Sequence, residues 1–178
     1  MVKMYFFGKI GIRIGQKILD FGCGKGNYTI PLARAIGSGG MVYALDKDKE
    51  VLEKLQKRIY IEELGNIKII HSADKLKIPI GNNVLDVVFL YDVIHSYYFT
   101  ESERVKLLSE ANRVLKVGGL LSVYPKHIEP DYVKEAVCKH NFLLEAELRE
   151  TLVHDDQPVE DTIINFRKIK ESQGAIYG

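Results

Sequence analysis

Tryptophan is absent from the sequence, and cysteine occurs only twice, at Cys23 and Cys138, in a chain of 178 residues. Two cysteines so far apart form neither a CxxC metal motif nor the disulfide framework of a small secreted protein. The sequence also lacks an apolar run long enough to span a membrane, and residues 1–8 are too short for the apolar core of a signal peptide. We therefore expect a cytoplasmic protein with no membrane partner and no metal site.

An excess of charge of either sign is missing as well. The 25 basic and 24 acidic residues leave a net charge of +1, so bulk electrostatics gives no reason to expect a nucleic-acid partner. A hydrophobic fraction of 46% in 178 residues is sufficient for one substantial core. The sequence therefore predicts a single domain over residues 1–178, in which residues 1–15 form a short lead-in segment.

What the sequence does contain is a cluster of glycines, because Gly22, Gly24 and Gly26 follow one another at two-residue spacing. Before them, residues 18–21 have the apolar, partly β-branched character of a buried parallel strand, and after them a helix begins near residue 27. Glycines so close together allow positive φ and let the backbone approach a ligand, while the first amides of the helix point at that ligand. The pattern predicts a small-molecule site at this turn.

The spacing of the glycines indicates which ligand binds. A dinucleotide-binding fingerprint places its third glycine three residues after the second, where this sequence has Asn27. The pattern Asp20-x-Gly22-x-Gly24-x-Gly26 instead resembles the glycine motif of the class I S-adenosylmethionine (SAM) methyltransferases. The resemblance covers most of the chain and implies SAM as the cofactor and S-adenosylhomocysteine as the product.

A second strand of buried type, at residues 41–46, ends on the carboxylate of Asp46. A carboxylate at this position can accept hydrogen bonds from two vicinal ribose hydroxyls, because it has two acceptor oxygens. The alternative is that Asp46 caps the next helix, but Asp48 is closer to that helix and equally suited as a cap. We therefore favour ribose binding by Asp46.

Two later segments extend the resemblance. Asp74 follows a third short strand, and the resemblance implies that it binds the adenine amino group, although an aspartate in a loop is often only a turn former. Residues 113–119, Arg-Val-Leu-Lys-Val-Gly-Gly, resemble the family's Arg-Val-Leu-Lys-Pro-Gly-Gly, with Val117 in place of the usual proline.

The cofactor-binding residues that the resemblance implies lie in the glycine turn and at the ends of the neighbouring strands. They are Asp20, Phe21, Gly22, Cys23, Gly24, Gly26, Asn27, Tyr28, Asp46, Lys47, Ala73, Asp74, Tyr91 and Asp92. No chemistry is assigned to Cys23, because its small size explains its place in the turn.

Alternating strands and helices along the chain predict an α/β fold. Helices are expected at residues 28–36, 49–64, 101–115 and 131–140, with Val105 facing the core and Asp131 capping the last helix. Strands are expected at residues 18–21, 41–46, 67–70, 84–91, 120–124, 142–153 and 159–169. Since no helix separates the last two strands, they should form an antiparallel hairpin. The resemblance implies a three-layer Rossmann-like fold whose seven-stranded, mostly parallel sheet has the order 3-2-1-4-5-7-6.

The acceptor should meet the cofactor where the fourth and fifth strands end, because parallel strands present their carboxyl ends to one crevice. His95 and His127 follow these strand ends and are candidate catalytic bases, since either imidazole can take a proton near neutral pH. The alternative is that each imidazole only hydrogen-bonds loop backbone. A base is optional, because methyl transfer from a sulfonium mainly requires alignment and exclusion of water.

The identity of the acceptor is not encoded in a recognisable motif. Residues 91–94, Tyr-Asp-Val-Ile, stand where enzymes that methylate DNA bases in this superfamily have Asp/Asn-Pro-Pro-Tyr/Phe. The sequence therefore predicts a methyltransferase with a small-molecule acceptor. A protein or RNA methyltransferase, a noncatalytic SAM-binding module and an NAD(P)-dependent oxidoreductase are the alternatives.

A transfer site also needs a cover, because water would weaken the electrostatics that align the reaction. The segment before the glycine turn is short for the family. We expect that residues 97–99 order over the ligand, or that the apolar segment at residues 5–7 packs against a second subunit in a homodimer.

Overall fold

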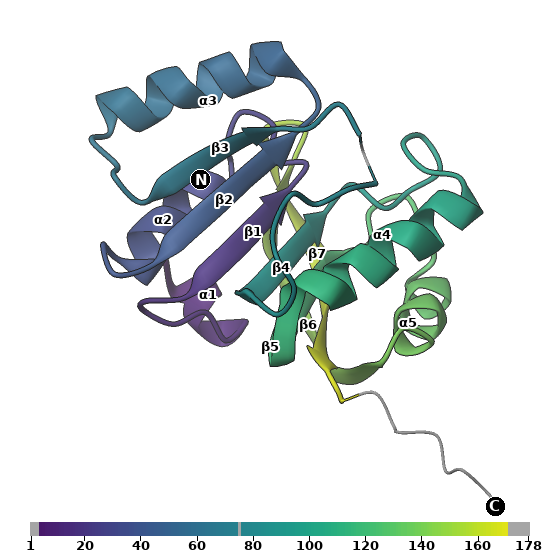
Figure 1. Cartoon of the computed structure of the whole chain (residues 1–178). Helices are drawn as coiled ribbons and strands as arrows, with labels where there is room; N and C mark the ends of the chain where they lie inside the picture. Colours follow the sequence, from purple (N-terminus) through teal and green to yellow (C-terminus); the bar gives the residue numbers. More distant parts are fainter. Residues whose placement is uncertain (1–3, 75, 171–178) are drawn as a thin grey trace, which may run out of the picture.

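The computed structural model describes residues 4–74 and 76–170 of the chain, and the following account concerns these residues. Helices and strands alternate along most of their length (Figure 1). In chain order they are α1 (Met4–Lys9), β1 (Lys17–Phe21), α2 (Thr29–Ile36), β2 (Met41–Asp46), α3 (Lys49–Ile61), β3 (Ile67–His71), β4 (Leu85–Tyr91), α4 (Glu101–Val114), β5 (Leu115–Tyr124), α5 (Pro130–Cys138), β6 (Phe142–His154) and β7 (Gln157–Lys168).

The seven strands form one sheet in the order β3-β2-β1-β4-β5-β7-β6. The first five strands along the chain pair in parallel, and β7 runs antiparallel to both β5 and β6. The predicted fold class and strand order are therefore confirmed. Because β1, β2 and β4 are neighbours and parallel, their carboxyl ends meet at one edge of the sheet (Figure 1).

Helices cover both faces of the sheet and complete three layers. On one face, side chains of α4 and α5 pack with apolar residues of the central strands, among them Leu19 and Phe21 of β1. On the other face, α1 and α2 pack against Ile18 of β1 and its neighbours, and α3 packs beside them on β2. Successive β1 residues thus alternate between the two cores, as the two-residue period of a strand requires.

The amino-terminal segment departs from the prediction. Residues 4–9 form the short helix α1, and Phe6 and Phe7 are buried, with exposed fractions of 2% and 1%. Their rings lie in the same core as Ile18 and Leu32. Phe6 and Phe7 are therefore not available for contact with a second subunit, whereas Tyr5 is 55% exposed.

Two helix details also differ from the sequence-based expectations. Val105 is 46% exposed, whereas Leu107 is buried, because the inward face of α4 follows the three- and four-residue spacing of Leu107, Ala111 and Val114. α5 begins at Pro130, whose fixed φ suits the first position of a helix, so Asp131 lies inside the first turn rather than at the cap.

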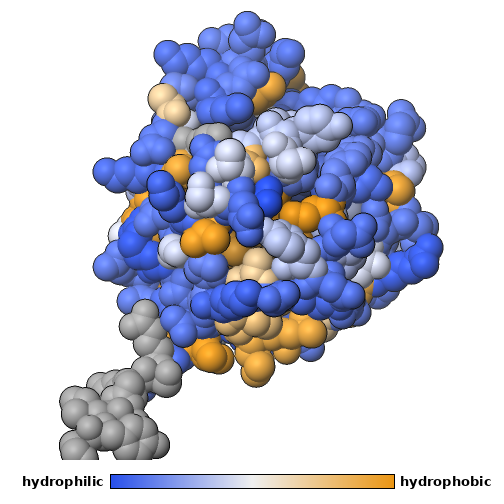
Figure 2. Space-filling model, turned by 90° about the vertical axis from the view of Figure 1, so that its right-hand side faces the viewer, coloured by the Kyte–Doolittle hydropathy of each residue, from blue (hydrophilic) through white to orange (hydrophobic). Residues whose placement is uncertain are grey.

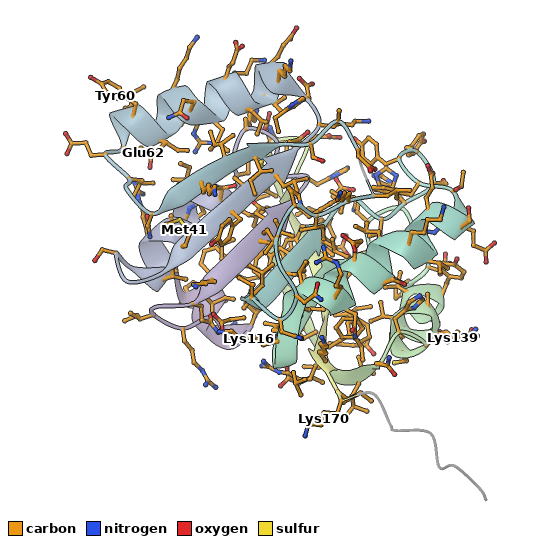
Figure 3. All side chains as sticks on the ribbon, in the orientation of Figure 1. Met41, Tyr60, Glu62, Lys116, Lys139 and Lys170 are labelled. Carbon is orange, nitrogen blue, oxygen red and sulfur yellow. The ribbon has the colours of Figure 1, made fainter. Side chains whose placement is uncertain are left out.

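The outer surface is mainly hydrophilic over α4 and α5, with apolar side chains in small groups (Figure 2). Met41, at the start of β2, and Lys116, near the start of β5, lie where the parallel strands begin, away from their carboxyl ends (Figure 3). Within the described residues, no helix has both the length and the apolar character needed to cross a bilayer.

The motif at residues 113–119 has a structural explanation in the contacts of Arg113. Its guanidinium donates to the backbone carbonyl of Ile80 at 2.8 Å and to that of Ile78 at 2.9 Å. It also forms an ion pair with Glu110, whose carboxylate in turn accepts from the N–H of Ile78. The arginine therefore fastens the loop before β4 to the end of α4.

Arg113→Lys should destabilise the protein by about 1 to 2 kcal/mol, because an ammonium cannot donate to both carbonyls and to Glu110 in the planar arrangement of a guanidinium. Urea unfolding of the purified variant measures this change. Arg149→Lys is the matched control, since Arg149 lies exposed on β6 and its replacement should leave stability unchanged. Equal effects of the two substitutions would contradict the role assigned to Arg113.

Candidate functional site

A pocket of about 550 Å³ lies at the carboxyl ends of β1, β2 and β4. Its size is in the range of small-molecule and cofactor sites. Of the predicted cofactor-binding residues, those in its wall are Phe21, Gly22, Cys23, Gly24, Asn27, Tyr28, Asp46, Lys47, Tyr91 and Asp92. The pocket therefore gathers residues from three strand ends that are far apart in the sequence.

The three glycines of the turn all have positive φ, at 72°, 53° and 88°, but they differ in their surroundings. A Cβ on Gly22 would lie 2.4 Å from Val93 Cγ1, and one on Gly26 would lie 2.4 Å from Leu55 Cδ1. A Cβ on Gly24 would meet no atom within 4 Å, and Gly24 lies in the pocket wall. A Cβ at 22 or 26 would therefore displace the Val93 or Leu55 side chain, whereas Gly24 faces open space in the pocket.

Asp46 lies beside Gly24 at the end of β2. Its Oδ2 accepts the N–H of Gly24 at 2.9 Å, and its Oδ1 accepts the N–H of Asp48 at 3.0 Å. The helix cap is Asp48, whose carboxylate accepts from the first amides of α3. Each Asp46 oxygen has a further lone pair, so the carboxylate is held in place and can still accept hydrogen bonds from a ligand.

Asp20 is buried behind the glycine turn and is not part of the pocket wall. Its carboxylate accepts a hydrogen bond from Thr29 Oγ1 at 2.6 Å. Burial raises the pKa of Asp20 to about 6, although the bond from Thr29 opposes the shift. Burial also raises the pKa of the Cys23 thiol, with the charges of Asp20 and Asp46 adding to it, so Cys23 stays protonated.

Ala73 and Asp74 lie exposed outside the pocket wall, which Ser72 reaches instead. Asp74 Oδ1 accepts the N–H of Leu76 at 2.9 Å, the two-residue pattern by which an aspartate stabilises a turn. Gly26 also lies outside the wall, in contact with Leu55.

The turn between β6 and β7 contributes a side of the pocket that sequence reasoning missed. Residues 153–156 lie in the pocket wall. The hydroxyl of Tyr28 accepts the N–H of Val153 at 2.9 Å, and Asp156 pairs with Lys25 and accepts from Asn27. The turn is thus fastened to the glycine loop and closes one side of the pocket. The polar sequence His154-Asp155-Asp156 in a hairpin connection was the available signal.

Three histidines gather beside Asp92, at the edge of the pocket. His154 Nδ1 lies 2.7 Å from Asp92 Oδ2, and His95 Nε2 lies 3.7 Å from Asp92 Oδ1. The ring centre of His127 is 5.5 Å from that of His95 and 5.0 Å from that of His154. The structure therefore brings the two predicted histidines together and adds His154, which the prediction lacked.

His95 contacts Asp92 and also accepts hydrogen bonds from its own loop. Its carbonyl accepts the N–H groups of Tyr98 and Phe99, and its Nδ1 accepts the N–H of Tyr97 at 3.3 Å. Burial lowers the pKa of His95, and the negative charge of Asp92 partly offsets this effect. Asp92 and His154 lie in the pocket wall, whereas His95 is buried next to Asp92 and His127 is exposed beside the pocket.

A second, more open depression of about 720 Å³ lies between residues 76–81 and α4. It contains none of the predicted site residues, and Arg113 occupies one side of it with the structural contacts described above. The pocket at the strand ends is therefore the candidate functional site.

The fold and the site together define a class of protein. A mostly parallel sheet in this strand order, with a glycine turn after its first strand and a carboxylate ending its second, is the arrangement expected of the class I SAM methyltransferases. The model of the methyltransferase domain family matches residues 18–119, which is more than half of the chain. The chain belongs to that family, and the resemblance drawn from the sequence is confirmed.

Curated relatives include demethylmenaquinone methyltransferases from two bacteria. The one from Geobacillus sp. (strain WCH70) is 32% identical over 111 residues, which are 62% of this chain and 45% of the relative. The one from Staphylococcus aureus (strain MRSA252) is 34% identical over 112 residues, or 63% of this chain and 44% of the relative. The chain thus matches less than half the length of either.

Solved structures show the same fold. A SAM-dependent methyltransferase from Aquifex aeolicus superimposes with a TM-score of 0.78 at 21% identity, covering 93% of this chain and 88% of the other. A second, from Methanosarcina mazei, has a TM-score of 0.77 at 15% identity and covers 93% and 98%.

Asp20→Asn should change how stability depends on pH. The folded protein holds the Asp20 proton up to about pH 6, whereas an unfolded chain releases it near pH ~4, so wild-type stability should fall as pH rises through this window. The pKa difference corresponds to about 3 kcal/mol. Because asparagine keeps an acceptor for Thr29, the variant should equal wild type at pH 4 and exceed it at pH 7 in urea unfolding.

Asp161→Asn is a control whose effect on stability should depend on pH in the opposite direction. Burial opposes the shift, but hydrogen bonds from Lys126, the Thr162 amide and Tyr124 leave the pKa of Asp161 lowered. This variant should therefore lose stability at pH 7, and the loss should shrink as pH falls through the folded-state pKa. If both variants follow the same pH profile, the account of Asp20 is wrong.

Proposed function

We propose that this protein is a SAM-dependent methyltransferase that acts on a small-molecule acceptor. The observation that carries the proposal is the pairing of Gly24, whose missing side chain leaves the pocket open, with the Asp46 carboxylate fixed beside it. The curated relatives bear the name demethylmenaquinone methyltransferase, which supports an acceptor of small-molecule size.

The residues around the pocket fit this cofactor. The Asp46 oxygens would accept from the ribose hydroxyls, and the backbone at Gly24 would lie against the ligand. Asp74 is exposed at the outer end of this region, and adenine recognition by Asp74 stays a prediction. When bound, SAM supplies a methyl group on a positively charged sulfur.

The chain's own part is to align the reactants and to exclude water. The contacts of Asp156 with Lys25 and of Val153 with Tyr28 hold the β6–β7 turn beside the glycine loop, which gives the pocket a cover from within the same chain. The turn is a cover that the sequence did not indicate, and the ordering of residues 97–99 over the ligand stays a prediction.

We place the acceptor between residues 91–99 and residues 124–127. Tyr98 and Phe99 of the first segment lie in the pocket wall, and the imidazoles of His95 and His127 stand next to Asp92 at this end. A planar acceptor could pack on these rings. His95 and His127 are therefore proposed to meet the acceptor rather than SAM.

A cytoplasmic location is proposed because both cysteines are free, as is usual in a reducing compartment. A homodimer stays a prediction, which light scattering can test.

Titration calorimetry tests the cofactor. SAM and S-adenosylhomocysteine should bind with one site per chain, and NAD and NADP should give no heat of binding. A methyl-transfer screen with labelled SAM then follows, on a panel of quinones and phenols that includes demethylmenaquinone. Binding of NAD without a response to SAM would overturn the proposal, and SAM binding without transfer to any acceptor would favour a noncatalytic module.

Gly24→Val should abolish SAM binding while the protein stays folded. A Cβ here meets no protein atom within 4 Å and points into the open pocket, so the branched side chain of valine would occupy the space proposed for the ligand. Gly15→Val is the matched control, because Gly15 also has positive φ and an open surrounding and precedes β1 at the opposite end of that strand. Both variants carry a similar backbone strain of about 1 to 3 kcal/mol, which circular dichroism and thermal melting check. Retained SAM affinity in Gly24→Val would refute the proposed position of the cofactor.

A further inference from the structure

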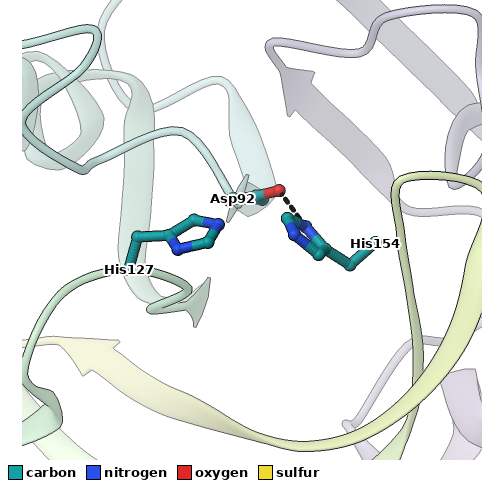
Figure 4. A group of neighbouring side chains, drawn as sticks. All are labelled: Asp92, His127 and His154. Carbon is teal, nitrogen blue, oxygen red and sulfur yellow. Dashed lines mark hydrogen bonds and ion pairs between the residues drawn. The ribbon is translucent and has the colours of Figure 1, made fainter.

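Asp92, His127 and His154 form a compact group of side chains that point toward one another (Figure 4). We call them the His–Asp cluster. One oxygen or nitrogen atom from each residue lies within 4.8 Å of those from the other two. They come from three separate places in the chain, the end of β4, the loop after β5 and the end of β6. The fold, rather than local sequence, brings them together.

The backbone at two of these residues is in an unusual conformation. Asp92 has a φ of 56° and His127 has a φ of 62°. Asp and His are among the side chains that tolerate this left-handed region, where most others are rare. The N–H of Asp92 also donates to the carbonyl of Tyr124 at 3.1 Å, which ties the end of β4 to the end of β5. Strained positions of this kind are common where side chains must converge on a ligand.

Asp92 lacks a permanent positive partner among the described residues. Its ion-pair partners there are two histidines, His154 at 2.7 Å and His95 at 3.7 Å. Within the same part of the chain, its Oδ1 is buried and has no hydrogen-bond partner. The lysines of the surrounding loops pair elsewhere, Lys25 with Asp156 and Lys126 with Asp161. A buried carboxylate oxygen without a partner is costly, so a bound cation would stabilise it.

We propose that Asp92, His127 and His154 bind one divalent transition-metal ion, such as Zn²⁺, Co²⁺ or Fe²⁺. Two imidazoles and one carboxylate are a ligand set that such ions prefer, and three protein ligands leave at least one position open. Ligand atoms about 2.1 Å from an ion lie roughly 3 to 4 Å apart, so pairs of ligand atoms near the 4.8 Å limit need to draw together by about 1 Å, and the 2.7 Å contact between Asp92 Oδ2 and His154 Nδ1 needs to open slightly. No metal site was expected from the sequence, because its two cysteines form no CxxC motif.

The place of this site suggests what the ion does. Asp92 and His154 lie in the pocket wall, so the open coordination position faces the region proposed for the acceptor. An acceptor with an ionisable hydroxyl could bind there through its oxygen, since a divalent ion favours the deprotonated form. This role rests on the proposed function. The metal site itself does not, because it depends only on the three side chains.

Cobalt binding tests the site directly, with the full-length chain prepared without a histidine tag and stripped of metal with a chelator. Co²⁺ is the probe, because its visible absorption strengthens when imidazole and carboxylate replace water in a four- or five-coordinate site. The wild-type protein should bind one equivalent of Co²⁺. Absorption and calorimetry measure this binding in the absence of SAM. Zn²⁺ should displace the Co²⁺ and remove the absorption.

His127→Asn and His154→Gln should each weaken Co²⁺ binding by at least about tenfold and weaken the absorption. Asparagine is chosen at 127 because it tolerates positive φ, so the variant should keep the fold. His71→Gln and His140→Gln are matched controls, since both histidines lie outside the cluster and their loss should leave Co²⁺ affinity unchanged. Circular dichroism confirms that all four variants are folded.

The metal site is refuted if the wild-type protein gives only the weak spectrum of hydrated Co²⁺, or if folded His127→Asn and His154→Gln variants bind Co²⁺ as tightly as wild type. Because these measurements contain no SAM, their failure is distinct from a failure of the proposed function. Cobalt binding without SAM binding would leave the metal site in place, and SAM binding without cobalt binding would leave only the methyltransferase proposal.

Discussion

The close packing of the glycine turn against its neighbours governs the whole carboxyl edge of the sheet. A side chain at Gly22 would displace Val93, one at Gly26 would displace Leu55, and both positions have a positive φ that favours glycine. These contacts hold the loop between the segment after β4 and α3. Gly24, between them, is left facing the pocket, and its amide is bound by Asp46 from the adjacent strand. The shape of the pocket therefore follows from a packing constraint behind it.

The antiparallel hairpin of β6 and β7 adds a wall to the pocket at the carboxyl ends of the parallel strands. β7 enters the sheet between β5 and β6, and this returns the turn at residues 155–156 to the glycine loop. Lys25, Asn27 and Tyr28 hold that turn by an ion pair and hydrogen bonds. The family model matches residues 18–119, so this wall of the pocket comes from a part of the chain that lies outside the match.

The end of the pocket that is proposed for the acceptor contains a group of titratable side chains. Asp92 stands between His95 and His154, and His127 packs against both rings. Such a group lowers the stability of the fold when no ligand is bound. It includes two non-glycine residues at positive φ and a buried carboxylate oxygen without a partner in the described structure. Features that reduce stability and converge on a pocket are typical of sites selected for function.

The sequence alone determined the seven strands, the helices α2 to α5, the glycine turn and the end of β2, because periodicity, glycine spacing and a terminal carboxylate are local signals. Burial of Phe6 and Phe7 and the position of His154 beside Asp92 were decided only by the tertiary structure. Each depends on contacts between segments distant in sequence, and a local pattern carries no information about which distant segment will meet it. The order of the strands, and the register in which β7 pairs with β5 and β6, decide which distant segments meet.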